Sequence, residues 1–81
     1  MRAQLKEGDI IKAKHTVDLI NMTAGDYYKV ESLMQDYYEA RYFLRKCDEG
    51  GVGKIGGTLE LAIGSLDFWI EDGSIEIFRS S

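Results

Sequence analysis

The sequence predicts an all-β fold, a small barrel or sandwich, from alternating side chains and turn signals. Asp72-Gly73 is a preferred pair for a type I′ turn, because both central residues of that turn need a positive φ. Folding residues 68–71 and 74–78 back on each other about this pair gives one face that is wholly apolar. That face consists of Phe68, Ile70, Ile75 and Ile77. Alternating segments also follow Gly8-Asp9 and Gly25-Asp26.

The first of these segments predicts a strand over residues 10–14, with Ile11 and Ala13 pointing inward. Residues 15–24 show no period and are rich in polar side chains, which indicates a long loop. Residues 27–31 then predict a second strand, in which Tyr28 and Val30 face the core.

Residues 32–47 fit two patterns. As a strand that follows a turn at Gln35-Asp36, this segment turns four side chains inward: Tyr38, Ala40, Tyr42 and Leu44. As a helix, it begins with a capping box of Ser32 and Gln35 and ends in basic residues. We prefer the strand, because the segment is rich in Tyr and Phe. The alternative is an α+β fold with a helix at about 33–47 packed on an antiparallel sheet.

The last part of the chain predicts a loop, a strand, a turn and the hairpin. Residues 48–57 hold five of the nine glycines and predict a mobile loop. Strict alternation over residues 58–63 predicts a strand with Leu59, Leu61 and Ile63 inward. Residues 64–67 predict the turn that leads into the final hairpin.

Length and composition indicate one soluble domain. At 81 residues the chain can form one small core, so we expect a single domain over residues 1–81. The one cysteine, Cys47, excludes an intrachain disulfide and a cysteine-based zinc site, as is typical of a reducing cytoplasm. No stretch approaches the roughly 20 apolar residues that span a bilayer. We therefore expect a cytoplasmic protein, without contact to a membrane or a metal.

The formal net charge of -4 is unevenly distributed. Residues 1–46 carry eight Lys and Arg against seven Asp and Glu, a balance of +1. Residues 47–81 carry two against seven, a balance of -5. An acidic chain is a poor general ligand for phosphate backbones, and its acidic half suits a basic protein surface or solubility.

The turn and strand signals together resemble those of small SH3-like barrel proteins of bacteriophages and Gram-positive bacteria. The signals are a Gly-Asp pair before a short strand, Ala-Gly-Asp-Tyr-Tyr-Lys-Val-Glu at residues 24–31, Asp-Glu-Gly-Gly at residues 48–51, and a closing aromatic strand. The resemblance implies a five-stranded, partly open barrel. It implies no activity, because this architecture serves protein binding, nucleic-acid binding and toxin chemistry alike.

The candidate catalytic residues lack the partners that chemistry needs. Residues 50–54, Gly-Gly-Val-Gly-Lys, miss the spacing of a phosphate-binding loop, because Asp48 replaces the first glycine and Ile55 follows Lys54. His15 stands without a nucleophile, and Cys47 has no second cysteine. The sequence therefore predicts a protein that is not an enzyme, with no cofactor.

The predicted hairpin leaves two aromatic side chains, Trp69 and Phe78, on its polar face. Exposed aromatics among charged residues are typical of contact surfaces in protein complexes. The sequence thus predicts a non-enzymatic protein-binding module that contacts a larger protein, and the resemblance suggests a phage factor that inhibits or redirects a host protein. The other residues of this predicted surface are Asp67, Glu71, Glu76 and Phe43.

A small nucleic-acid-binding barrel is the alternative. In the strand interpretation, residues 41–46 interleave basic and aromatic side chains, a pattern that can meet phosphates and stack bases. The residues assigned to this function are Arg41, Arg45, Lys46 and Lys54, together with Phe43. Glu39 in the same row and the acidic C-terminal half weaken this alternative.

Overall fold

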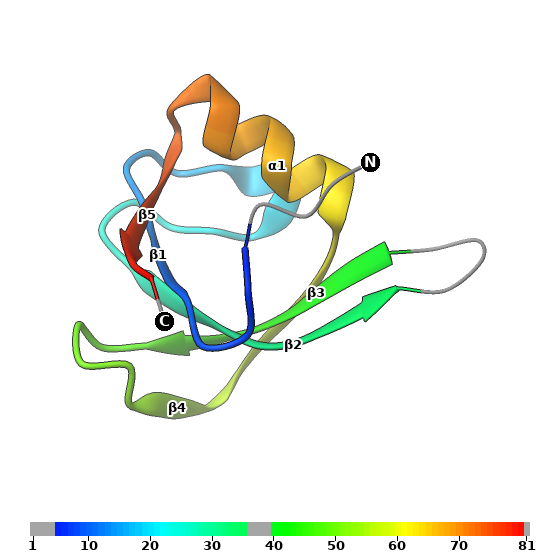
Figure 1. Ribbon diagram of the computed structural model, residues 1–81. Helices are drawn as coiled ribbons and strands as arrows, with labels where there is room; N and C mark the ends of the chain where they lie inside the picture. Colours follow the sequence, from blue (N-terminus) through cyan, green and yellow to red (C-terminus); the bar gives the residue numbers. More distant parts are fainter. Residues whose placement is uncertain (1–4, 36–39, 81) are drawn as a thin grey trace.

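Five antiparallel strands form one open sheet, and one short helix covers one of its faces (Figure 1). The computed structural model describes residues 5–35 and 40–80. The elements are β1 (Ile10–Ala13), the 3-10 helix η1 (Asp18–Ile20), β2 (Tyr27–Gln35), β3 (Ala40–Cys47), β4 (Gly53–Ala62), α1 (Ile63–Asp72) and β5 (Ile75–Arg79). The strand order is β4-β3-β2-β1-β5, so the last strand returns to pair with the first.

The predicted β-rich fold is confirmed at this level. Residues 40–47 form a strand in which Tyr42 and Leu44 are buried, as the strand interpretation requires. The alternative helix at about 33–47 is wrong, because β2 and β3 pair along this segment. The turn predicted at Gln35-Asp36 and the position of Tyr38 lie outside the described residues.

The predicted C-terminal hairpin is wrong. Asp72-Gly73 does not join two strands, because residues 63–72 form α1 and β5 pairs with β1 instead. Gly73 has the positive φ that the turn pair suggested, at 92°, but it uses this conformation to end the helix. Its N–H donates to the Ile70 carbonyl at 3.2 Å. A glycine with a positive φ serves either structure, so this dipeptide alone does not distinguish them.

Two further predictions that depended on the hairpin are also wrong. Residues 64–67 are the first half of α1 rather than a turn. Phe68 and Ile77, which were expected to face the core, are 57 % and 41 % exposed. The apolar side chains that α1 does bury are Ile63 and Leu66, with Ile70 partly buried against the core. Their spacing of three and four residues is typical of a helix.

Tertiary contacts hold α1 in place. A ten-residue helix is marginal alone, and Ala62 at its N-cap provides no side-chain hydrogen bond. Its apolar stripe completes a core whose sheet side consists of Ile11, Ala13, Tyr28, Val30, Tyr42, Leu44, Leu61 and Ile75, with Leu59 partly buried. The loop before β2 closes this core with Val17, Ile20 and Met22.

A buried polar contact joins α1 to the sheet and to the N-terminal segment. The Tyr42 hydroxyl donates to Asp67 Oδ1 at 3.2 Å and accepts from the Leu5 N–H at 3.1 Å. Tyr42 and Leu5 are buried, and Asp67 is only 6 % exposed. Polar groups at such a depth need partners, so this hydroxyl fixes three segments of the chain at one point.

We expect Tyr42→Phe to lower the free energy of unfolding by about 1–3 kcal/mol, because it leaves the buried Leu5 N–H without this acceptor and removes a donor from Asp67. Urea denaturation followed by circular dichroism measures the change. Tyr27→Phe is the matched control, since the Tyr27 hydroxyl is an exposed donor at 3.5 Å from Glu49. Equal destabilisation by the two variants would contradict the proposed role of the buried contact.

Candidate functional site

Within residues 5–35 and 40–80, the structure contains two separate aromatic pairs where the sequence predicted one. Phe68 and Trp69 meet edge to face on α1, with ring centroids 5.1 Å apart. Tyr27 and Phe78 meet in the same manner on the sheet, with centroids 4.8 Å apart. α1 packs on the core side of the sheet, whereas Tyr27 points to the other side because its neighbour Tyr28 is in the core. Trp69 and Phe78 therefore belong to different surfaces.

The first candidate surface, which we call the α1 surface, consists of Phe68, Trp69, Glu71 and Asp72. Phe68 is its most exposed aromatic residue, at 57 %. Trp69 is partly buried against the core and supports the Phe68 ring from the side. The pair thus combines an anchored indole with a phenyl ring that is open to a partner.

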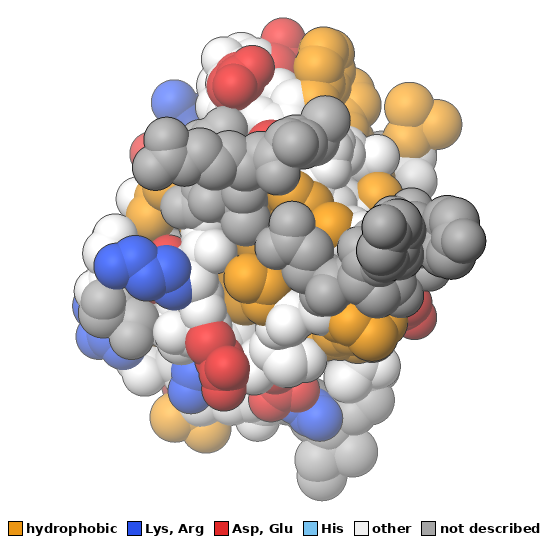
Figure 2. Space-filling model, turned by 45° about the vertical axis from the view of Figure 1, so that its right-hand side comes forward, with side chains coloured by type: hydrophobic (Ala, Val, Ile, Leu, Met, Phe, Trp, Pro, Cys, Tyr) orange, Lys and Arg blue, Asp and Glu red, His pale blue; other side chains and the backbone are white. Residues whose placement is uncertain are grey.

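The charges of the α1 surface lie at the end of the helix where they stabilise it least. Backbone carbonyls give a helix C-terminus a partial negative charge, so that carboxylates there are unfavourable. Glu71 and Asp72 occupy the last turn of α1, which has no basic residue. Asp72 accepts a hydrogen bond from the Ser74 hydroxyl at 2.7 Å. Figure 2 shows acidic and hydrophobic side chains together at the top of the molecule, the end at which α1 finishes in Figure 1.

The other residues of the predicted protein-binding surface are dispersed. Asp67 is buried beside Tyr42 and cannot line an exposed rim. Glu76 and Phe78 are exposed on β5, where Phe78 meets Tyr27. Phe43 lies half-buried on β3, opposite Ser32 and Glu60. The predicted set is not one contiguous site.

The basic residues predicted for nucleic-acid binding face carboxylates. Arg41 Nε lies 3.5 Å from Glu60 Oε1, and Arg45 Nε donates to Glu31 Oε1 at 3.0 Å. Both arginines point away from the core, but Lys46 follows them on the opposite side of the strand. The side chain of the fourth residue, Lys54 on β4, lies outside the described part of the structure. The positive charges of Arg41 and Arg45 are thus largely neutralised by carboxylates of the same chain.

Lys46 forms its ion pair at the end of the sheet, with Nζ 3.0 Å from Asp26 Oδ2. The hydrogen bond that the Lys46 ammonium donates to this carboxylate, and then the charge of the carboxylate, raise the pKa of Lys46 above its ordinary value of 10.5. The pair is therefore fully formed at neutral pH, and its contribution to stability is lost only as the pH rises through the raised pKa.

The glycine-rich turn between β3 and β4 is tied down, contrary to the mobile loop predicted for residues 48–57. β4 already begins at Gly53, so the turn spans only residues 48–52. Asp48 Oδ1 accepts from the N–H groups of Gly50 and Val52 at 2.9 and 3.0 Å. Arg79 Nη2 donates to the Gly50 carbonyl at 3.2 Å and fastens the turn to β5. A strand rather than a helix follows Lys54, so the segment lacks the architecture of a phosphate-binding loop.

The two candidate catalytic residues, His15 and Cys47, lie in different environments. His15 is exposed after β1, and Cys47 is buried at the end of β3. No cluster of three His, Cys, Asp or Glu side chains suited to a metal ion occurs within residues 5–35 and 40–80. Over the same residues, α1 and η1 are both too short to cross a bilayer.

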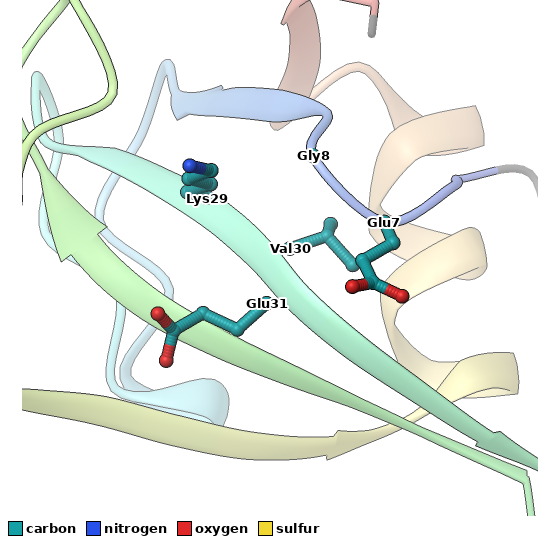
Figure 3. Close-up of a pocket in the computed structure, with 5 residues that line it drawn as sticks. All are labelled: Glu7, Gly8, Lys29, Val30 and Glu31. Carbon is teal, nitrogen blue, oxygen red and sulfur yellow. The ribbon is translucent and has the colours of Figure 1, made fainter.

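The surface also has an open depression of about 320 Å³ between the N-terminal segment and β2 (Figure 3). It is lined by Glu7, Gly8, Lys29, Val30 and Glu31. Val30, its one large apolar residue, is fully buried and belongs to the core. Figure 3 shows Glu7 on the side of β2 that carries Val30 and Glu31 reaching to the other side, so the charged groups do not converge. Such a depression offers little apolar contact to a small molecule.

Comparisons with protein-family models, curated proteins and solved structures find no match to this chain. The functional argument therefore depends on the surfaces themselves.

We expect Gly51→Ala to destabilise the protein by about 1–2 kcal/mol. Gly51 has a φ of 85°, and an added Cβ would lie 3.1 Å from Ile10 Cδ1. Gly50→Ala in the same turn is the control, because Gly50 has no positive φ and its Cβ would make an ordinary contact with Asp48. Thermal unfolding should show a lower midpoint for Gly51→Ala alone, and equal midpoints for both variants would mean that the turn is not held as described.

Proposed function

We propose that this protein is a non-enzymatic protein-binding module that binds a larger protein through its α1 surface. The observation that supports this most is the position of Phe68, more than half exposed and braced by a partly buried Trp69. Aromatic residues of this kind are typical of the residues that contribute most to binding energy in protein interfaces.

The carboxylates beside this aromatic pair indicate the chemistry of the partner. Glu71 and Asp72 add negative charge to the negative end of α1, where they do not benefit helix stability. A partner with Lys or Arg side chains would neutralise this end and could place a cation over the exposed Phe68 ring. The excess of acidic residues in the C-terminal half favours the same approach.

The resemblance to small SH3-like barrel proteins extends this proposal. The sheet order, in which β5 returns to β1 beside a long β2, supports a partly open five-stranded barrel of this type. From the resemblance we further propose a phage-encoded factor that acts in the cytoplasm of a bacterial host and inhibits or redirects a host protein.

Nucleic-acid binding through Arg41, Arg45 and Lys46 is the weaker alternative. Each of these cations already faces a carboxylate of the same chain, and Lys46 lies on the opposite side of β3 from the two arginines. A phosphate would have to displace three ion pairs to use this row.

The partner can be sought by affinity purification from a bacterial lysate with wild-type protein and Phe68→Ala. We expect Phe68→Ala to fold normally, because the side chain is 57 % exposed, and to lose at least ten-fold of the bound partner, as is typical of an aromatic residue central to an interface. The partner should carry a basic surface and should dissociate more readily at high salt.

Phe78→Ala is the matched control, because it removes an exposed aromatic residue from the other side of the sheet. Recovery of the same proteins by wild type and Phe68→Ala would refute the α1 surface. Loss of partners in Phe78→Ala alone would place the interface on the sheet instead.

A further inference from the structure

The face of the sheet that points away from α1 carries a second exposed aromatic residue, Phe78 of β5. Ile11 pairs with Ile77 and Ile10 with Arg79, so that Phe78 is an extra residue in β5. Alternation along β5 from the core residue Ile75 puts Phe78 on the same side as Glu76, away from the core, where its ring meets that of Tyr27. Phe78 remains 41 % exposed. We call this side of the sheet the outer face.

Basic side chains surround the Tyr27–Phe78 pair on the outer face. Lys12 lies opposite Tyr27 in the sheet and holds its Nζ 5.5 Å from the centre of the Tyr27 ring. Lys29 lies two residues further along β2 on the same face, directly opposite Arg45 of β3. Arg79, beside Phe78, donates from Nη2 to the Gly50 carbonyl of the neighbouring turn at 3.2 Å.

One of these positions is unfavourable for the protein alone. Like charges directly opposite each other in neighbouring strands destabilise a sheet, and Lys29 and Arg45 form such a pair. Lys12 lies opposite Glu76 of β5, yet its ammonium is turned toward the Tyr27 ring. Glu31 offsets the charge of Arg45, Glu76 lies opposite Lys12, and Glu49 accepts from the Tyr27 hydroxyl at 3.5 Å. Among the described residues, Lys12, Lys29 and Arg79 form no ion pair, so these three cations border the aromatic pair.

We propose that the outer face binds single-stranded nucleic acid, with a base stacked on Phe78 and phosphates held by Lys12, Lys29 and Arg79. An exposed aromatic ring bordered by cations on a sheet is the arrangement with which sequence-independent single-strand binders work. Neighbouring positive charges add little to the binding of a protein, whereas they can bind the successive phosphates of a nucleic acid. This site is distinct from the cations of β3 (Arg41, Arg45 and Lys46), which form ion pairs, and from the α1 surface on the other side of the sheet.

Fluorescence anisotropy with labelled oligo-dT and oligo-U of 12 nucleotides tests the site on the intact protein. We expect binding at 20 mM salt that weakens as salt is added, with a slope of log K against log salt of about -2 for three phosphate contacts. Phe78→Ala should weaken binding at least five-fold, as the loss of one stacked base does. Lys29→Gln should reduce the magnitude of the slope by about 0.7.

Two control variants make the outcome specific. Phe68→Ala removes an exposed aromatic residue from α1, and Lys46→Gln removes a cation from the opposite side of β3, so both should bind oligonucleotides like the wild type. No binding at 20 mM salt, or equal weakening by Lys46→Gln and Lys29→Gln, would overturn the proposal. Unchanged binding by a folded Phe78→Ala variant would also overturn the proposal, because the oligonucleotide would then be held by charge attraction without a stacked base. Loss of the protein partner in Phe68→Ala tests the α1 surface separately.

Discussion

The hydroxyl of Tyr42 is the contact on which the arrangement of this small protein depends. The N-terminal segment, β3 and α1 are far apart in the sequence, and this hydroxyl joins all three at one buried point. Burial of the apolar stripe brings α1 to the sheet with Ile63 and Leu66 facing inward. The contact of the Asp67 carboxylate with Tyr42 supports the same rotation of the helix about its axis. Because Asp67 faces inward, the next residue, Phe68, lies at the exposed side of the helix.

The order of the strands in the sheet explains how one short chain has two different surfaces. β5 is the last strand in sequence and pairs with the first, so the strand that follows α1 reaches the outer face near Tyr27. The acidic residues of the C-terminal half remain largely with α1 and the turns. The lysines of β1 and β2 lie on the outer face, together with Arg79 at the end of β5.

Most of the sheet could be predicted from the sequence, but the grouping of residues at the candidate site could not. Alternation identified β1, the first half of β2 and β3, because one side of each strand is buried and the other is not. It failed at residues 63–72, where Phe68 and Ile70 also alternate with polar residues. The spacing of Ile63, Leu66 and Ile70 was the signal for a helix, and Gly73 was the signal for its end. The prediction followed the preference of Asp-Gly for hairpin turns instead of these two helix signals, and it was therefore wrong.

The error in one element changed which residues share a surface, because a helix and a strand distribute neighbouring side chains differently. In a hairpin, Trp69 and Phe78 would be diagonal neighbours, and Asp67 would lie beside them. In the helix, Asp67 and Trp69 turn toward the sheet, and Phe68 takes the exposed position. Tyr27 could not be found as the neighbour of Phe78 from the sequence, since their contact depends on β2 and β5 both pairing with β1. Aromatic residues could therefore be identified as candidates from composition, but their grouping required the register of β5 against β1.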